Sequence, residues 1–217
     1  MIGELLPGAV TVAATTGDID TELAPAEQAV VGNAVHKRRV EFVTGRALAR
    51  QALRRIGVEA ASIASGPKGD PVWPAGIVGS ITHCAGYRAC AVARAAEVGS
   101  VGIDAEVHAP LPGGVLEDVA SLLEQQRLRA AARDGLHLDR VLFSAKEAVY
   151  KAWFPLAGRW LGFEDVDMEI GLHDGTWAGR LLVPGPLVGD VPLAGFGGRW
   201  AVRSGIVLTA VTVPAPR

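Results

Sequence analysis

A segment rich in residues that interrupt helices and strands lies in the middle of the chain. Residues 107–114 read V-H-A-P-L-P-G-G, with two prolines and two glycines in eight positions. Proline and glycine break regular secondary structure, so this segment predicts a boundary between two halves. Each half carries both helix and strand patterns, and 217 residues are enough for one large domain or two small ones. We therefore expect an α+β fold made of residues 1–109 and residues 110–217.

Hydrophobic periodicity predicts the elements within each half. Apolar residues recur at helical spacing after Pro25, and Gly57 marks the end of that helical stretch. The predicted strands of the first half cover residues 9–14, 78–84, 89–93 and 98–107, with a Gly/Pro-rich loop at 66–76. The second half is predicted as a helix over about 115–133, a helix that holds Glu147 and Lys151, and a β-rich tail.

The composition is that of an ordinary soluble globular protein, with 49% hydrophobic and 20% charged residues. A net charge of −2 gives no global basic field, which argues against a nucleic-acid partner. No apolar run approaches the length of a membrane span, and no signal peptide is predicted, so we expect no membrane association. Cys84 and Cys90 fit neither a redox pair nor a zinc ribbon, which favours reduced thiols in a cytoplasmic protein.

Two short motifs carry the candidate chemistry. V-G-I-D-A-E on a predicted strand places Asp104 and Glu106 on one face, because successive strand side chains alternate. F-S-A-K-E-A-V-Y-K on a predicted helix places Glu147 and Lys151 on one face, four residues apart. If the two segments meet, three carboxylates and one ammonium converge. Such a set can hold Mg²⁺ and bind a phosphate-bearing substrate.

Each motif also has a purely structural interpretation. Ser144 and Glu147 fit the S-x-x-E capping box, and Glu147 with Lys151 forms an ordinary helical ion pair. Asp104 and Glu106 fit a solvated strand face. Against these readings, Glu147 and Lys151 share their face with aromatic residues, where an uncompensated charge is expensive.

Three further groups are candidates for contacts to phosphates. Thr82 and His83 lie at the end of the predicted strand over 78–84, near a glycine turn, and can donate hydrogen bonds to a terminal phosphate or serve a structural role. Arg38 and Arg46 lie eight residues apart on the basic helix, hence on one side, and can bind a polyphosphate or form a solvated face. The nucleotide-binding P-loop, the dinucleotide-binding glycine motif, the zinc-protease motif and the serine-hydrolase motif are all absent from the sequence.

The two acidic motifs, about forty residues apart, resemble the hallmark motifs of the 4′-phosphopantetheinyl transferases. The longer, monomeric class is the more similar one. G-S-I-T-H-C-A-G-Y-R and P-V-W-P-A-G resemble segments of its enterobactin-synthetase-component and actinobacterial branches, and K-R-R-V-E-F-V-T-G-R is similar too. The resemblance spans roughly residues 25–156. It implies two similar α+β halves related by a pseudo-twofold axis, with coenzyme A bound at their interface.

The resemblance also implies a reaction, in which the phosphopantetheine arm of coenzyme A moves to a serine of an apo acyl or peptidyl carrier protein. The product released is 3′,5′-ADP. The metal would be held by Asp104, Glu106 and Glu147. Glu147 is the first candidate for the general base, with Glu106 as its rival, and Lys151 would contact the phosphate under attack. The nucleotide phosphates would be bound by Arg38, Arg46, Thr82, His83 and Lys68, where Lys68 stands alone in a loop that carries two basic residues in some relatives.

Several alternatives stay open at this level. Mg²⁺ and Mn²⁺ accept the same oxygen ligands. A coenzyme A-binding module without turnover would keep Arg38, Arg46 and His83 but would need no carboxylate triad. A carrier-binding protein would use a basic surface, for which Arg127, Arg129 and Arg133 are candidates, although they also fit a solvated helix face. A chain with both halves need not dimerise to build the site, so we expect a monomer.

Overall fold

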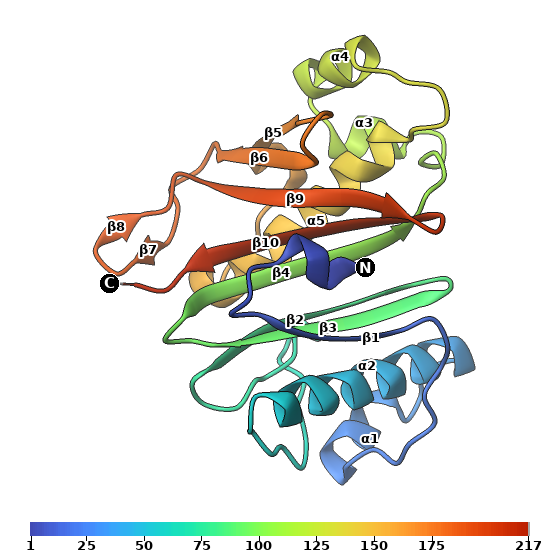
Figure 1. The fold of residues 1–217 in the computed structure, drawn as a ribbon, viewed down its shortest axis with the longest axis vertical. Coiled ribbons are helices and arrows are strands. Elements are labelled where there is room, and N and C mark those ends of the chain that lie inside the picture. The colour runs from blue at the N-terminus through green and yellow to red at the C-terminus, as the bar shows by residue number, and fades with distance from the viewer. Residues whose placement is uncertain (217) are drawn as a thin grey trace.

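The structure is a computed structural model, and it describes residues 1–216. Two antiparallel sheets lie side by side, and each carries one long helix (Figure 1). The first sheet has the order β1-β3-β2. Its strands are β1 (Thr11–Thr15), β2 (Ile77–Cys84) and β3 (Tyr87–Arg94), and its helices are α1 (Pro25–Val31) and α2 (His36–Arg55). A short 3-10 turn, η1 (Ile2–Leu5), precedes them.

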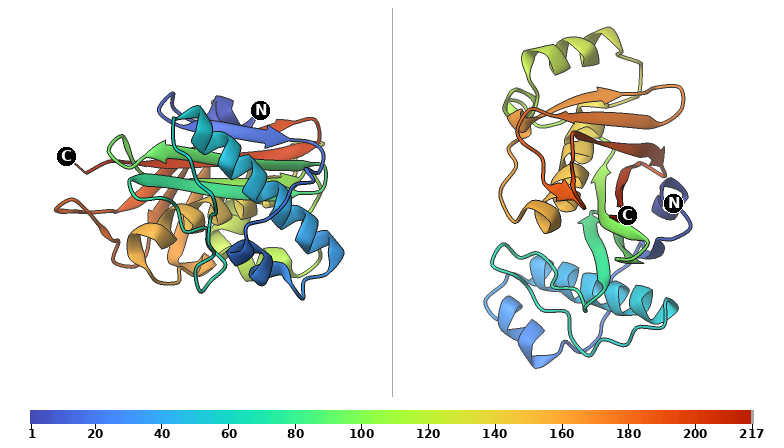
Figure 2. Two further views of the ribbon diagram at one scale, coloured as in Figure 1. Left: turned by 90° about the horizontal axis from the view of Figure 1, so that it is seen from below. Right: turned by 90° about the vertical axis from the view of Figure 1, so that its left-hand side faces the viewer.

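The second sheet has five strands in the order β4-β10-β9-β6-β5. They are β4 (Val98–Val107), β5 (Val166–Ile170), β6 (Thr176–Leu181), β9 (Gly195–Arg203) and β10 (Ile206–Pro214). Its long helix is α5 (Leu138–Ala157), preceded by α3 (Val115–Val119) and α4 (Leu122–Ala130) and followed by the turn η2 (Phe163–Asp165). A small hairpin, β7 (Leu187–Val188) and β8 (Val191–Pro192), completes this half. The right-hand view of Figure 2 places α1 and α2 at one end of the molecule and α4 at the other.

The α+β prediction, with two halves built on one plan, is confirmed. The predicted boundary at 109/110 follows β4, yet β4 hydrogen-bonds to β10, so this strand belongs to the sheet of the second half.

The predicted helix over 115–133 is wrong. The chain is extended at Ala120, and Ser121 begins a new helix by accepting a hydrogen bond from the Glu124 N–H. Cys84 and Cys90 are free thiols, as expected.

Strand β4 is where the two halves meet. Its side chains alternate between the core that both sheets share, which contains Val101, Ile103 and Ala105, and the face covered by α5. On that face Gly102 allows α5 to approach closely, because a Cβ there would lie only 3.0 Å from the Ala152 backbone nitrogen. The α5 helix ends at Gly158, which takes the left-handed conformation that favours glycine.

The two sheets meet along β4 and β2, and this line of contact is called the seam. At the seam they are joined by hydrogen bonds to side chains and not by a backbone ladder. The N–H groups of Ile103 and Ala105 on the outer edge of β4 donate to Ser80 Oγ (3.2 Å) and Thr82 Oγ1 (3.0 Å) on β2. Both hydroxyl residues are buried, so the edge N–H groups are satisfied without water. Within residues 1–216, no helix combines the length and the apolar character needed to cross a bilayer.

Candidate active site at the seam between the halves

The strand motif and the helix motif meet, which the sequence alone left as a condition. Asp104 lies on the face of β4 that α5 covers, and the Nζ of Lys151 on α5 is 2.6 Å from Asp104 Oδ1. The same ammonium donates to the Ile103 carbonyl oxygen at 3.2 Å. Two segments that are 47 residues apart in sequence therefore form one charged cluster.

Asp104 is buried, with 4% of its surface exposed, and all of its partners are donors. Besides Lys151, the Thr82 hydroxyl donates to Oδ1 at 3.2 Å and the Ser144 hydroxyl donates to Oδ2 at 2.8 Å. These donors hold the carboxylate in one orientation. Ser144 is a site residue that the sequence reasoning assigned only to a possible helix cap.

Glu106 is held by Arg140, a residue that the sequence reasoning missed. Arg140 lies on α5, and its guanidinium is 3.0 Å from Glu106 Oε2 and also donates to the carbonyl oxygens of Ala109 and Pro110. Burial raises the pKa of Glu106, the charge of Asp104 adds to this, and Arg140 and Lys151 oppose it. No motif in the sequence identifies Arg140, because its role depends on how the linker folds back over α5.

Glu147 is half-buried on α5, and among residues 1–216 no hydrogen bond or ion pair involves its carboxylate. Burial raises its pKa, Lys151 opposes this, and Asp104 adds to it. The capping-box interpretation is wrong, because Ser144 lies inside α5 and not at its start. Beside Glu147 is a slot of about 90 Å³ with aromatic walls from Tyr150, Trp160 and Phe163.

The donor chemistry of these residues fits a hard divalent cation. Asp104, Glu106 and Glu147 offer carboxylate oxygens, which Mg²⁺ prefers. Burial makes negative charge costly at Glu106 and Glu147, so a cation would compensate it. Within the described residues no three His, Cys, Asp or Glu side chains are gathered closely enough to hold a metal. In this structure Lys151 and Arg140 instead pair with Asp104 and Glu106.

The candidate phosphate-binding residues separate into two groups. Arg38 and His83 lie together, with 3.1 Å between the Arg38 guanidinium and His83 Nε2. On the other side of the ring, Glu41 approaches His83 Nδ1 at 3.6 Å. Burial lowers the pKa of His83, and Glu41 opposes this shift. Because Arg38 donates to Nε2, the imidazole is neutral there and Nδ1 carries the proton.

Arg46 and Lys68 belong to the second group. Arg46 is only 4% exposed, lies over the Phe42 ring and donates to Ser65 Oγ at 2.8 Å, so it holds the loop that carries the exposed Lys68. The contacts of Thr82 differ from those expected for the phosphate-binding role that the resemblance implies. It is 2% exposed, and its hydroxyl is occupied by Asp104 and the Ala105 N–H.

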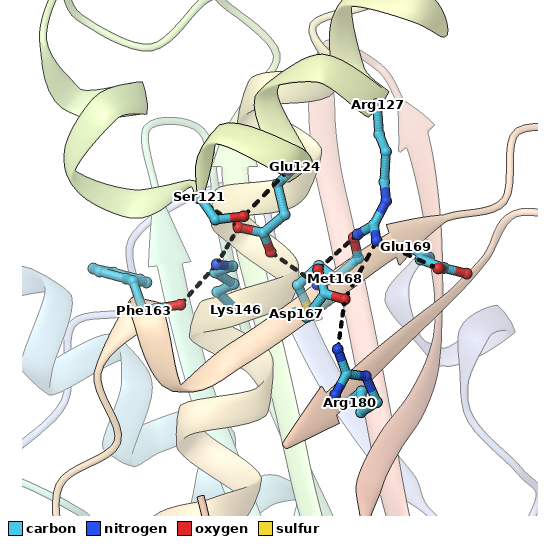
Figure 3. Close-up of polar contacts among 9 residues, drawn as sticks. All are labelled: Ser121, Glu124, Arg127, Lys146, Phe163, Asp167, Met168, Glu169 and Arg180. Atoms are coloured by element: carbon cyan, nitrogen blue, oxygen red, sulfur yellow. Dashed lines mark hydrogen bonds and ion pairs between the residues drawn. The ribbon is translucent and has the colours of Figure 1, made fainter. Parts of the chain in front are cut away.

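The candidate basic surface on α4 and just after it, formed by Arg127, Arg129 and Arg133, is smaller than the sequence suggested. Figure 3 shows Arg127 turned toward β5, where it is 2.6 Å from Asp167 Oδ1 and also close to Glu169. Arg127 is thus part of an internal network, whereas Arg129 and Arg133 are exposed.

A buried ion pair fixes α4 to α5 next to this network. Lys146 Nζ is 2.9 Å from Glu124 Oε2 and 2.7 Å from the Phe163 carbonyl oxygen (Figure 3). Burial lowers the pKa of Lys146, and the hydrogen bond to Glu124 opposes this. Lys146 precedes Glu147 in the chain, so this pair also fixes the part of α5 that carries the candidate base.

Comparison with known proteins identifies the family of this chain. Residues 26–93 match a 4′-phosphopantetheinyl transferase N-terminal domain, and residues 100–181 match the 4′-phosphopantetheinyl transferase superfamily. The chain is 50% identical to the 4′-phosphopantetheinyl transferase Svp of Streptomyces mobaraensis, over all of this chain and 90% of that one. It is 48% identical to PptT of Mycobacterium tuberculosis, over 87% and 85% of the two chains. Enterobactin synthase component D of Salmonella typhi is 35% identical over 56% of this chain and 50% of its own.

The two α+β halves joined at a charged seam match the two domains of one transferase family. The chain belongs to the 4′-phosphopantetheinyl transferase superfamily. It is therefore an enzyme that transfers the phosphopantetheine arm of coenzyme A to a carrier protein.

Proposed function

We propose that the reaction takes place at the seam and depends on Mg²⁺ held by Asp104, Glu106 and Glu147. The observation that carries the proposal is the 2.6 Å contact between Lys151 and Asp104, which unites the two motifs. A cation held there would compensate the negative charge of the pyrophosphate of coenzyme A, which would favour attack by an incoming oxygen and stabilise the departing phosphate. Mn²⁺ accepts the same oxygen ligands and is the second candidate.

The chain's own residues then have the following roles in the transfer. A carboxylate takes the proton from the carrier serine, whose oxygen forms a bond to the phosphorus that bears the pantetheine arm. The bond from this phosphorus to the bridging oxygen breaks, and 3′,5′-ADP leaves with the electron pair. Lys151 contacts the phosphate under attack. Such reactions depend mainly on positioning and charge compensation.

Glu147 is the better candidate for the base, and Glu106 is its rival. A general base near neutral pH gains from a raised pKa, and both carboxyls have one. Glu106 is engaged by Arg140 at 3.0 Å, whereas the Glu147 carboxylate has no hydrogen-bond or ion-pair partner among residues 1–216. Glu147 therefore has no protein partner to leave before it accepts a proton, directly or through water.

Coenzyme A would lie across the first half and extend toward the aromatic slot. Arg38 and His83 would bind a terminal phosphate, and Arg46 and Lys68 would serve the other nucleotide phosphates, Arg46 by holding the loop of Lys68. The pantetheine arm is uncharged, so the aromatic slot that adjoins Glu147 offers it a suitable wall. This path would bring the scissile phosphate toward Asp104 and Glu147.

The partner would be an apo acyl or peptidyl carrier protein. Its acidic helix would be attracted by exposed Arg129 and Arg133, which have no ion-pair partner among residues 1–216. Both halves of the site lie on one chain, so we propose a monomer. Coenzyme A as substrate and two free thiols are consistent with a cytoplasmic enzyme.

Intact-protein mass spectrometry tests the proposal. A panel of apo carriers is incubated with the protein, coenzyme A and Mg²⁺, with and without EDTA. We expect a mass gain of one phosphopantetheine that is lost with EDTA and restored by excess Mg²⁺. Glu147→Gln should abolish the gain, and Glu59→Gln, at an exposed position on the first half, should not. Full transfer by Glu147→Gln or in EDTA would contradict the assignment.

A further inference from the structure

Hydroxyl groups from two different elements donate to the Asp104 carboxylate, Thr82 on β2 and Ser144 on α5, and Thr209 on β10 is hydrogen-bonded to Ser144. We propose that Thr82 and Ser144 are positioning residues that fix the Asp104 carboxylate for metal binding. The inference rests on the proposed role of Asp104 as a metal ligand. It assigns to Thr82 a different task from the phosphate contact that the family resemblance implies.

Ser144 holds one oxygen of the carboxylate. Its hydroxyl is 2.8 Å from Asp104 Oδ2 and 2.9 Å from Thr209 Oγ1, and the whole residue is buried. A serine has a single hydroxyl proton. The Thr209 hydroxyl donates to the Ser144 carbonyl oxygen at 2.9 Å, and an ionised carboxylate is the stronger acceptor, so the Ser144 proton goes to Asp104.

Thr82 holds the other oxygen, from the opposite half of the molecule. Its hydroxyl donates to Asp104 Oδ1 at 3.2 Å and accepts from the Ala105 N–H at 3.0 Å. The acceptor bond fixes where the hydroxyl oxygen lies, and the donor bond is then directed at the carboxylate. Thr82 therefore ties the orientation of Asp104 to the joining of the two sheets.

The two hydroxyls contact different oxygens of one carboxylate, which restrains both side-chain rotations of Asp104. Lys151 binds only Oδ1, so it cannot do this alone. A ligand that is already oriented loses less conformational entropy when it binds a metal. Loss of such an outer-shell partner typically lowers metal affinity by about 10- to 100-fold.

Neighbouring Ser80 provides a matched control. Its hydroxyl accepts from the Ile103 N–H at 3.2 Å, just as Thr82 accepts from Ala105, but within residues 1–216 it makes no hydrogen bond to Asp104. Ser80→Ala and Thr82→Val both remove one seam hydrogen bond. Only Thr82→Val also removes a donor to Asp104, so the difference between the two variants isolates that bond.

Mn²⁺ titrations followed by electron paramagnetic resonance, in the presence of coenzyme A, measure the affinity directly. We expect Thr82→Val and Ser144→Ala each to weaken Mn²⁺ binding by about 10- to 100-fold. Thr82→Ser, which keeps the hydroxyl, and Ser80→Ala should stay near wild type. Urea unfolding confirms that each variant is folded.

The outcomes separate this inference from the proposed function. If Asp104→Asn binds Mn²⁺ as well as wild type, the metal assignment itself is wrong. If Asp104→Asn loses the metal but Thr82→Val and Ser144→Ala bind it like Ser80→Ala, the metal assignment stands and the positioning role is refuted. A KM for coenzyme A that rises in Thr82→Val while Mn²⁺ affinity is kept would return Thr82 to phosphate binding.

Discussion

One methyl group added at Gly102 should lower both the stability of the fold and the rate of transfer. It lies on β4 between the buried residues Val101 and Ile103, two residues before Asp104, and faces the backbone of α5. A Cβ at Gly102 would be 3.0 Å from both the Ala148 carbonyl carbon and the Ala152 nitrogen, and would overlap the Ala148 carbonyl oxygen. All these atoms belong to the helix backbone, so no side chain can rotate away to make room.

The expected effect of Gly102→Ala follows from these distances. Favourable contacts between carbon atoms lie at about 3.5–4.0 Å, so α5 would have to move outward by at least about 0.5–1 Å. Overpacking of this kind typically costs about 1–3 kcal/mol of folding free energy. The same movement separates Lys151 and Glu147 from Asp104. A displacement of about 1 Å in an active site can cost on the order of 100-fold in rate.

Urea unfolding and single-turnover transfer, followed by mass spectrometry, measure the two effects. Gly197→Ala on β9 is the matched control, because its Cβ would meet nothing within 4 Å and the position is exposed. Alanine is otherwise preferred to glycine inside a strand by roughly 0.5–1 kcal/mol. Gly197→Ala should therefore be neutral or slightly stabilising. Wild-type stability and rate in Gly102→Ala would refute the claim that this contact sets the position of α5.

Three further predictions concern the second half. Arg127 holds the pKa of Asp167 below its ordinary range, so the ionised carboxylate stabilises the fold above about pH 4 and loses this contribution as pH falls through the folded-state pKa. Thermal unfolding of Asp167→Asn should consequently depend less on pH below this point than that of wild type. Trp160→Ala should weaken binding of coenzyme A by about 3- to 10-fold in calorimetry but leave 3′,5′-ADP binding unchanged, because only the former carries the arm that meets the aromatic slot. Lys146→Met should lower the free energy of unfolding in urea by roughly 3–5 kcal/mol, and the addition of Glu124→Gln should restore part of it, since it removes the uncompensated carboxylate.

The central motifs could be predicted from sequence because strand and helix periods decide which side chains share a face. Asp104 and Glu106 are two residues apart on β4, and Glu147 and Lys151 are four apart on α5. These spacings require no knowledge of the rest of the fold. The partner of Glu106 could not be found in this way. Arg140 reaches Glu106 only because the linker after β4 folds back along α5.

Capping boxes show the limit of local reasoning. The pattern S-x-x-E occurs at Ser121–Glu124 and again at Ser144–Glu147. The first is a real helix start, which divides the predicted helix over 115–133 into two. The second lies inside α5, where the Ser144 hydroxyl donates to Asp104. The two motifs differ in the tertiary partner of the serine, and the local sequence does not contain that partner.

The sequence nevertheless contains a pattern that corresponds to the seam, and the structure shows what this pattern does. Alternate N–H groups of a strand point to the same edge, so the free edge of β4 presents donors two residues apart, at Ile103 and Ala105. Strand β2 provides the acceptors, which are hydroxyl groups two residues apart in the tripeptide Ser80–Thr82. The matching period means that a hydroxyl pair of this spacing on one edge strand can satisfy another edge strand without a backbone ladder. Because Thr82 at this seam also donates to Asp104, the hydroxyl pair that joins the halves also contacts the proposed metal ligand.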